Sequence, residues 1–274
     1  MTSAKQTLYL QQPFSPTSST RFFYVTTQAS AAIAKTSFVL QRRQGLTLII
    51  GKVGFGKTSL LRYIEDALRD DPAYYVTRLN NPDYKSDFAL LKAISAQFEI
   101  TAKRSQLEQR QALETKLAQL YEEGRNSVLL IDEANLLKGD HFEVLRQLLN
   151  FEVEQAKLLQ IILAAQPEIN EKLRVKKRQP LVSRITITST LDEFTFDDMV
   201  AMVEHRLHVA NWSGPRLTED SKITLYSCSH GVPRNIVKIC NLAFEMASIN
   251  GTEVTSQLIE EASKSTVYDP NDIE

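Results

Sequence analysis

Short apolar runs alternate with amphipathic segments over residues 28–190 of this chain. Five of these runs have the length and composition of buried strands, at residues 46–50, 74–79, 127–131, 158–164 and 184–188. Strands of this kind, separated by helical segments, are typical of a parallel sheet. We therefore predict an α/β subdomain over residues 28–190.

The helices between these runs carry recognisable start and stop signals. Ser105 and Glu108 have the spacing of a capping box, and Gly124 follows the last apolar position of the helix they begin. The apolar positions between them recur at helical spacing, at Leu113, Leu117, Leu120 and Tyr121. A second amphipathic helix is predicted directly after the first strand, with Leu60, Leu61, Ile64 and Leu68 on its apolar face.

The strand pattern ends near residue 190, and the rest of the chain is predicted to be helical. Residues 196–210, 219–230 and 233–249 have helical patterns, which indicates a helical lid subdomain over residues 191–266. Residues 1–27 are rich in Ser, Thr, Gln and Pro and contain Phe-Phe-Tyr at 22–24, so we expect an arm that packs onto another part of the fold. Residues 267–274 form a polar tail.

Composition places the chain among ordinary soluble proteins. It has 274 residues, of which 43% are hydrophobic and 24% charged, and a net charge of −1. No apolar stretch approaches the roughly 18 residues that span a bilayer, and the first residues lack a secretory signal, so we expect a cytoplasmic protein without membrane partners. Cys228 and Cys240 are interpreted as buried thiols. The four histidines are interpreted as structural, because their spacing completes no metal site.

Residues 51–58 match the pattern G-x-x-x-x-G-K-[ST], between a buried strand and an amphipathic helix. In such a loop, backbone N–H groups surround the phosphates of a nucleoside triphosphate, and the helix N-terminus adds positive potential. Lys57 reaches the β- and γ-phosphates, and Thr58 offers a hydroxyl to Mg²⁺. The residues predicted to bind ATP here are Gly51, Val53, Gly54, Phe55, Gly56, Lys57, Thr58 and Ser59.

A second motif follows the third strand, where Ser-Val-Leu-Leu-Ile ends in Asp132 and Glu133. This has the form of a Walker B motif, in which Asp132 holds Mg²⁺ and Glu133 polarises the attacking water as a general base. Taken alone, two adjacent acidic residues at a strand end can also be ordinary surface residues. Paired with the phosphate-binding loop upstream, it predicts Mg²⁺-dependent ATP hydrolysis.

Three further polar residues are candidates for catalytic roles. Gln166 ends the fourth strand, where its amide can lie near the γ-phosphate, or it can be an ordinary loop residue. Arg234 begins a helix of the lid, from which it can reach the phosphates; the alternative is a surface arginine. Arg184 precedes the last strand, where it can act in trans on a neighbouring subunit's nucleotide or be a plain strand-end charge.

Together, these motifs resemble the AAA+ ATPases of the ExeA, TniB, MuB and TnsC group, over residues 13 to about 262. The resemblance implies a five-stranded parallel sheet of order 5-1-4-3-2 with a helical lid, and nucleotide bound between neighbouring subunits. It also implies that Gln166 is sensor 1, that Arg234 is sensor 2, and that Tyr24 and Gln28 help to enclose the adenine. The group often has Gln where this chain has Asn135, a departure that leaves Asp132 and Glu133 unchanged.

Within the group, the lack of a transmembrane segment or further domain favours the transposition branch over ExeA-like secretion ATPases. Proteins of that branch assemble with ATP on double-stranded DNA as rings or filaments, mark a target site and recruit or activate a transposase. Hydrolysis then drives their disassembly. An ExeA-like secretion module and a scaffold with little hydrolysis remain as alternatives, and Glu133 argues against the scaffold.

The basic residues of the chain allow DNA binding through a local surface, since the whole chain is nearly neutral. Residues 171–184 carry six basic residues against one Glu, and Lys85, Lys103 and Arg104 lie in two further loops. No aromatic residues interleave with these cations, so contacts to the DNA backbone without sequence preference are expected. The resemblance favours Lys85, Lys103 and Arg104 as the DNA contacts. The 171–184 cluster can instead serve a subunit interface or the nucleotide.

Overall fold

The computed structural model describes residues 12–15, 19–154 and 156–267. The chain divides into two compact units. An α/β unit is formed by Thr27–Val53 and Leu60–Leu191. A helical unit is formed by the residues from Asp192 onward, together with Gly54–Ser59 and the residues up to Thr26. Each unit is considered separately.

The α/β unit is built on a five-stranded sheet in which every adjacent pair is parallel. The strand order is β2-β3-β6-β1-β7, which is the predicted order 5-1-4-3-2 read from the other side. All five predicted strands are present, with ends that shift by up to three residues. Their bounds are β1 (Leu46–Gly51), β2 (Tyr74–Leu79), β3 (Asn126–Ile131), β6 (Leu159–Ala165) and β7 (Ile185–Leu191).

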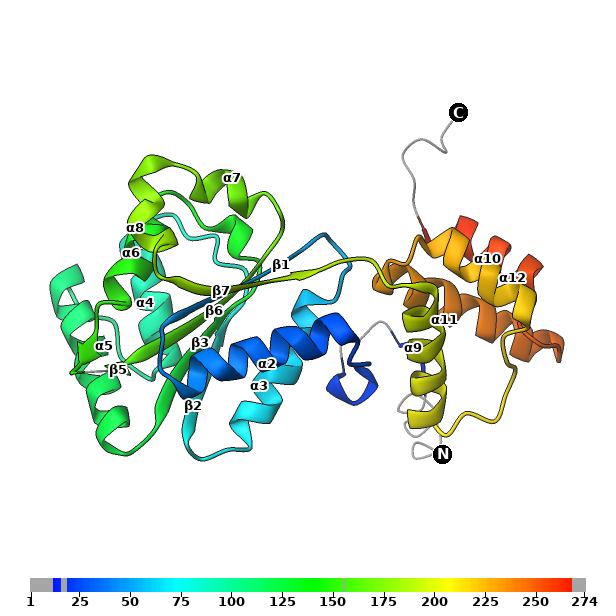
Figure 1. The fold of residues 1–274 in the computed structure, drawn as a ribbon, viewed down its shortest axis with the longest axis horizontal. Helices are drawn as coiled ribbons and strands as arrows, with labels where there is room; N and C mark the ends of the chain where they lie inside the picture. The colour runs from blue at the N-terminus through cyan, green and yellow to red at the C-terminus, as the bar shows by residue number, and fades with distance from the viewer. Residues whose placement is uncertain (1–11, 16–18, 155, 268–274) are drawn as a thin grey trace. The chain divides into compact units, whose positions relative to one another are not determined.

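Helices connect the strands and cover both faces of the sheet (Figure 1). The predicted capping box at the start of α5 (Gln106–Glu122) is confirmed, because the Ser105 and Glu108 side chains each bond the other's backbone. A two-stranded hairpin, β4 (Glu152–Val153) with β5 (Ala156–Lys157), was not predicted. The helices are α2 (Thr27–Gln41), α3 (Lys57–Arg69), α4 (Asp87–Gln97), α5 (Gln106–Glu122), α6 (His141–Leu148), α7 (Ile169–Leu173) and α8 (Gln179–Val182), with 3-10 turns η2 (Ala134–Leu136) and η3 (Lys176–Arg178).

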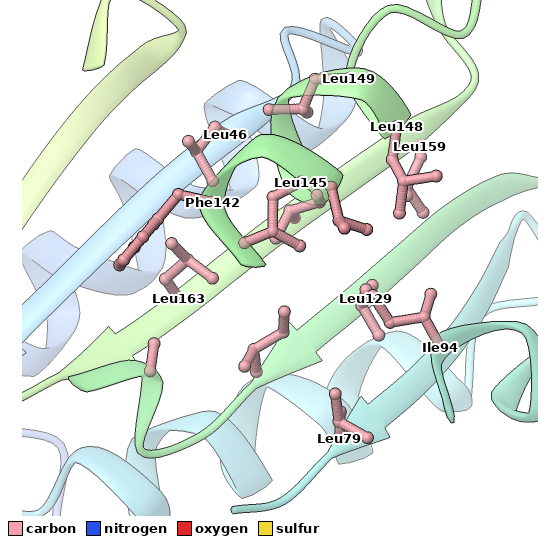
Figure 2. Close-up of a cluster of buried hydrophobic side chains, with 14 of the residues drawn as sticks. Leu46, Leu79, Ile94, Leu129, Phe142, Leu145, Leu148, Leu149, Leu159 and Leu163 are labelled. Carbon is pink, nitrogen blue, oxygen red and sulfur yellow. The ribbon is translucent and has the colours of Figure 1, made fainter. Parts of the chain in front are cut away.

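A large apolar core lies between one face of this sheet and helices α4, α5 and α6. Figure 2 shows Leu145 and Leu148 of α6, and Leu149 at its C-cap, together with Leu46 of β1 and Leu159 of β6. Each of these side chains is no more than 1% exposed. Complete burial of leucine side chains is the main source of stability in such a layer, at about 1.5–3 kcal/mol for each. The core therefore holds the strands of the sheet in place, and with them the loops that follow the strand ends.

The helical unit contains the three helices predicted after residue 191 and one more. They are α9 (Phe196–Val209), α10 (Glu219–Ser229), α11 (Pro233–Asn250) and α12 (Ser256–Thr266). The last helix was not predicted, because it is short and largely polar. It begins at the Thr255 cap, whose side chain accepts a hydrogen bond from the Leu258 N–H, and it buries Leu258, Ile259 and Ala262.

The described part of the arm packs within the helical unit, with a 3-10 turn η1 at Thr20–Phe22. Phe14 is 2% exposed, and its ring lies 4.7 Å from that of Phe244 of α11. The Arg206 guanidinium donates a hydrogen bond to the Pro13 carbonyl oxygen at 2.9 Å, and burial lowers the Arg206 pKa to about 10. Arg21 bonds the Val209 carbonyl oxygen at 2.7 Å, so these residues form part of the unit's core and its edge.

Several sequence-based expectations concern residues at the chain ends or the cysteines. The polar tail predicted from residue 267 lies outside the described residues except for Val267, as do residues 1–11 and 16–18 of the arm. Cys240 is fully buried, and burial raises the pKa of its thiol. Cys228 was expected to be buried too, but it is partly exposed near the end of α10. Among the described residues, no helix is both long and apolar enough to cross a membrane.

Candidate nucleotide-binding site

The phosphate-binding loop begins where β1 ends, at Gly51, and leads into α3, whose first residue is Lys57. Gly54 and Gly56 have positive φ angles of 84° and 87°, a conformation that favours glycine. Phe55 between them is 6% exposed, and the exposed fraction of Lys57 is 9%. The loop is therefore held by the buried side chains of Phe55 and Lys57. Its two glycines have backbone conformations that other residues rarely adopt.

Within the helical unit, Gly54 lies directly against the start of α11. The Arg234 N–H donates a hydrogen bond to the Gly54 carbonyl oxygen at 3.2 Å. A Cβ atom at Gly54 would lie 3.0 Å from a methyl group of Val232 and 3.1 Å from the Arg234 Cβ. This close approach, together with the positive φ, explains why glycine occupies the tip of the loop. It also places the backbone of Arg234 beside the loop.

The two carboxylates follow β3 and differ sharply in environment. Asp132 is 5% exposed, and its N–H donates to the Leu79 carbonyl oxygen at 3.0 Å. Its carboxylate accepts a hydrogen bond from the Glu133 N–H at 2.9 Å. Glu133 is exposed and has the left-handed conformation, with φ 50° and ψ 40°. A non-glycine residue held there stores strain of about 1 kcal/mol or more, a feature that clusters at functional sites.

Gln166 follows β6, which lies between β1 and β3 in the sheet. Because all the strands are parallel, the residues that follow these three strands emerge at one edge of the sheet. The half-buried Gln166 therefore lies between the strand that leads into the phosphate-binding loop and the strand that ends in Asp132. This is the order of groups expected for a site that binds and hydrolyses a nucleotide.

Arg184 lies at the opposite edge of the same sheet. Leu191 at the end of β7 pairs with Gly51, whereas Ile185 at its start pairs with Leu46. At about 3.3 Å per residue, Arg184 is therefore roughly 20 Å from the level of Gly51 along the strand. Its guanidinium bonds the Pro180 carbonyl oxygen at 2.6 Å and Asn150 Oδ1 at 2.7 Å, which holds it at the surface.

The two residues expected near the adenine are four residues apart in sequence, but Tyr24 belongs to the helical unit and Gln28 to the α/β unit. The ring of Tyr24 packs in the helical unit, with its centroid 5.8 Å from that of His205. Gln28 lies in the first turn of α2. Their adenine-binding role stays a prediction.

The three cations expected to contact DNA are exposed, and each lies just before a helix of the α/β unit. Lys85 precedes Ser86, the cap of α4; Lys103 and Arg104 precede Ser105, the cap of α5. The Gln106 side chain donates to the Asp87 carboxylate at 3.2 Å, so the first turns of the two helices lie together. The helix dipoles add positive potential at this surface.

The basic cluster at 171–184 divides into structural and exposed members. The Lys172 ammonium donates to the Leu137 carbonyl oxygen at 2.9 Å. The Arg178 guanidinium donates to the Lys172 carbonyl oxygen and lies 4.9 Å from the Phe142 ring centroid. These side chains therefore hold the local fold, whereas Arg174, Lys176 and Lys177 are exposed.

The sequence interpretation missed a link near the carboxylates, formed by Lys138 and His141. The Lys138 N–H donates to His141 Nδ1 at 3.1 Å. Burial, assisted by the nearby Lys138 charge, lowers the pKa of His141. The Lys138 ammonium lowers the pKa of the Asp83 carboxyl, to which it is hydrogen-bonded. In the sequence, only the position of Lys138, six residues after Asp132, indicated that it could lie near the site, and position alone is weak evidence.

Comparisons with known proteins agree with this geometry. Residues 40–173 match the family described as AAA domain, a range that includes the phosphate-binding loop, Asp132, Glu133 and Gln166. The chain is 32% identical over 245 residues to general secretion pathway protein A of Aeromonas hydrophila. The match covers 88% of this chain and 44% of that protein, so the chain spans less than half of that relative's length.

Solved structures with the same fold include Cdc6p and ORC proteins. The crystal structure of Cdc6p from Pyrobaculum aerophilum matches with a TM-score of 0.72 and 18% identity, covering 93% of this chain and 71% of that one. The Aeropyrum pernix ORC2 protein, in ADPNP–ADP complexes, matches with a TM-score of 0.66 and 17% identity, covering 89% and 68%. The Aeropyrum pernix ORC1 protein in complex with DNA matches with a TM-score of 0.66 and 15% identity, covering 86% and 64%. The fold is therefore the α/β AAA+ P-loop fold.

Proposed function

We propose that this chain is an ATP-dependent, DNA-binding regulator of transposition, similar to the TnsC and TniB proteins. With ATP and Mg²⁺ it assembles on double-stranded DNA as a ring or filament, marks the target and recruits or activates a transposase through target-selector partners. Hydrolysis then drives disassembly. The observation that carries the ATPase part is one sheet edge with a phosphate-binding loop after β1, carboxylates after β3 and Gln166 after β6.

The residues present fit MgATP. Thr58 offers a hydroxyl and Asp132 a carboxylate, the oxygen ligands that Mg²⁺ prefers, and Asp132 is already oriented by its bond with the Glu133 N–H. When bound, the metal neutralises developing charge on the phosphates. Lys57 binds the phosphates and Glu133 takes the proton of the attacking water. Gln166 and Arg234 orient the γ-phosphate and water, while Tyr24 and Gln28 bind the adenine.

The position of Arg184 supports the proposed assembly. Because Arg184 lies roughly 20 Å along the strand from the level of Gly51, it is too distant to serve the nucleotide of its own subunit. An arginine at a subunit boundary can serve the nucleotide of the next subunit, where it stabilises transition-state charge. Hydrolysis is then coupled to contact between neighbouring copies.

The DNA surface comprises Lys85, Lys103 and Arg104, at the N-terminal ends of α4 and α5. With a net charge of −1, one subunit attracts DNA weakly, so firm binding requires several subunits to sum their contacts. The similarity to the Aeropyrum pernix ORC1 protein, solved in complex with DNA, supports this part of the proposal through fold alone. The contacts are to phosphates, and the protein acts in the cytoplasm.

The second candidate is a secretion-associated ATPase module. The observation that favours it is the 32% identity to general secretion pathway protein A. Such a module needs the same nucleotide site but no duplex DNA. DNA dependence therefore separates the two candidates.

The test measures binding to two unrelated DNA duplexes with ATP, ADP or no nucleotide, at several salt concentrations. We expect binding only with ATP, equal affinity for both duplexes, and a steep decrease with salt. Replacing Lys103 and Arg104 together with Met should weaken binding equally on both duplexes and lower the salt slope by about one for each lost contact.

The matched control is the double replacement of Lys176 and Lys177 with Met, which removes the same charge from an exposed turn elsewhere. We expect it to bind DNA like wild type. Equal binding in every nucleotide state, or no binding at low salt with ATP, would contradict the DNA proposal and favour the secretion module. If the control pair loses more DNA affinity than the Lys103 and Arg104 pair, the DNA surface would instead be the 171–184 cluster.

A further inference from the structure

Asn135 joins the loop that carries Glu133 to the loop that carries Gln166. Its Oδ1 accepts a hydrogen bond from the Gln166 N–H at 3.2 Å. Asn135 lies in η2, directly after the two carboxylates, and Gln166 directly follows β6. The strands β3 and β6 are neighbours in the sheet. One side chain thus connects the ends of two adjacent strands at the edge where the nucleotide site is proposed.

The main chain of Asn135 is held from a second direction. The Lys172 ammonium donates to the Asn135 carbonyl oxygen at 2.5 Å and to the Leu137 carbonyl oxygen at 2.9 Å. Lys172 belongs to α7, which begins three residues after Gln166. The 3-10 turn and the segment after β6 are therefore cross-linked by the Asn135 side chain and by the Lys172 side chain.

This cross-link bears on the conformation of Glu133. The turn that contains Asn135 begins at Glu133, whose carbonyl oxygen accepts from the Leu136 N–H at 2.8 Å. Glu133 itself is in the left-handed conformation, which persists only where the surroundings hold it. If the turn loosens, Glu133 can relax toward a commoner backbone conformation, and its carboxylate then moves relative to Gln166.

We propose that Asn135 is a positioning residue for nucleotide hydrolysis, which acts by fixing Glu133 and Gln166 relative to each other. The inference rests on the proposed ATPase function. Asn135 does not itself need to contact the nucleotide, because its side-chain acceptor is used by the Gln166 N–H. It follows that losing this acceptor slows the chemical step and leaves ATP affinity nearly unchanged.

The test compares Asn135→Ala with Asn135→Asp, which keeps an acceptor oxygen in the same place. We expect Asn135→Ala to lower kcat about ten- to a hundredfold, as for a misplaced catalytic group, with ATP affinity within about twofold of wild type. Asn135→Asp should restore most of kcat. The matched control is Asn170→Ala, which makes the same change at an exposed position of α7.

Amide hydrogen exchange at Gln166, followed by NMR, gives a readout independent of turnover. Exchange of the Gln166 N–H should be faster in Asn135→Ala than in wild type and slow in Asn135→Asp. Wild-type kcat in Asn135→Ala, or equal loss in the Asp and Ala variants, would overturn the inference. Absence of turnover in wild type, with slow Gln166 exchange intact, would instead count against the proposed ATPase function.

Discussion

The Lys138 ammonium lies 2.8 Å from the Asp83 carboxylate and donates a hydrogen bond to the Tyr84 carbonyl oxygen at 3.0 Å. Lys138 follows the turn after Glu133, and Asp83 and Tyr84 lie in the loop that carries Lys85. The Lys138 side chain therefore connects the loop of the proposed DNA surface to the segment that follows Asp132 and Glu133, the carboxylates proposed to be catalytic. Both partners of the ion pair are more than half exposed, so the pair adds little to overall stability.

This connection predicts that Lys138→Met uncouples DNA binding from hydrolysis. We expect ATP hydrolysis without DNA to remain near the wild-type rate, while stimulation by duplex DNA falls severalfold. Because Lys138→Met also removes a cation near the proposed DNA surface, stimulation is measured at saturating DNA. Lys92→Met, in the neighbouring helix α4, controls for loss of charge. If DNA stimulates Lys138→Met as strongly as wild type, Lys138 does not couple DNA binding to hydrolysis.

A second prediction separates the roles of Glu133 and Lys57. Glu133→Gln should keep ATP binding and lower kcat by about 10²- to 10⁴-fold, because Asp132 and the loop survive while the general base is lost. Lys57→Ala should abolish ATP binding, because Lys57 is the proposed phosphate-binding side chain of the loop. Titration with labelled ATP and single-turnover hydrolysis measure the two effects. Wild-type turnover in Glu133→Gln would exclude it as the base.

The third prediction concerns Arg184, which we expect to act across a subunit boundary. Arg184→Ala should bind ATP but hydrolyse it poorly. Mixing Arg184→Ala with Lys57→Ala should restore part of the activity, because one kind of boundary then pairs an intact loop with an intact arginine. Hydrolysis is measured over a range of mixing ratios. No recovery, with mixed oligomers demonstrated by pull-down of tagged subunits, would show that Arg184 does not act in trans.

Local sequence was sufficient to predict the five strands and the two main motifs. The strand at 46–50 and the glycines after it are adjacent in sequence, so pattern alone indicates the loop. Asp132 and Glu133 follow their strand in the same way. The sheet order came from the family resemblance, since periodicity says which segments are strands and nothing about their neighbours.

Contacts between distant segments could not be predicted. The Lys138–Asp83 ion pair joins two loops that the sheet brings together, and neither sequence context marks it. The same holds for Phe14, whose partner Phe244 lies near the other end of the chain. In the basic run at 171–184, sequence also misleads. Lys172 and Arg178 look like free surface charges, but in the structure they bond backbone carbonyl oxygens.

Phe14 gives a fourth prediction, on the stability of the helical unit. Phe14→Ala should destabilise that unit by about 3–5 kcal/mol, because it leaves a cavity beside Phe244. Trp212, the single tryptophan of the chain, lies against Phe244 with ring centroids 6.1 Å apart, so its fluorescence reports unfolding of this unit. Urea unfolding followed by that fluorescence measures the change.

Phe38→Ala is the matched control for Phe14→Ala, since Phe38 is 43% exposed and lies in α2 of the α/β unit. We expect the tryptophan-detected transition of Phe38→Ala to match wild type. Phe14→Leu should lie between Phe14→Ala and wild type, because it refills part of the cavity. An unchanged midpoint in Phe14→Ala would mean that the arm contributes nothing to the stability of the helical unit.

The last prediction is a pH dependence that arises from His141. Burial, followed by the nearby Lys138 charge, lowers the pKa of His141 below its ordinary value of 6.5. A hydrogen bond with the Ser86 backbone and then the Asp140 and Asp87 charges oppose this shift. The folded state therefore favours the neutral imidazole, whose Nδ1 accepts the Lys138 N–H. Around pH 6 the unfolded state binds more protons than the folded state, so this contribution to stability is complete above pH 6.5 and decreases as the pH falls.

We expect the free energy of unfolding to depend less on pH in His141→Asn than in wild type between about pH 7.5 and pH 5.5. Asn offers an acceptor oxygen near the place of Nδ1 but has no proton to bind in this range. Urea unfolding followed by circular dichroism at several pH values measures the difference between the two proteins. His208→Asn removes an exposed imidazole from α9 and serves as the control. Because burial also lowers the pKa of His205, wild type and His141→Asn should both retain some loss of stability on acidification, and identical slopes in the two would contradict the prediction.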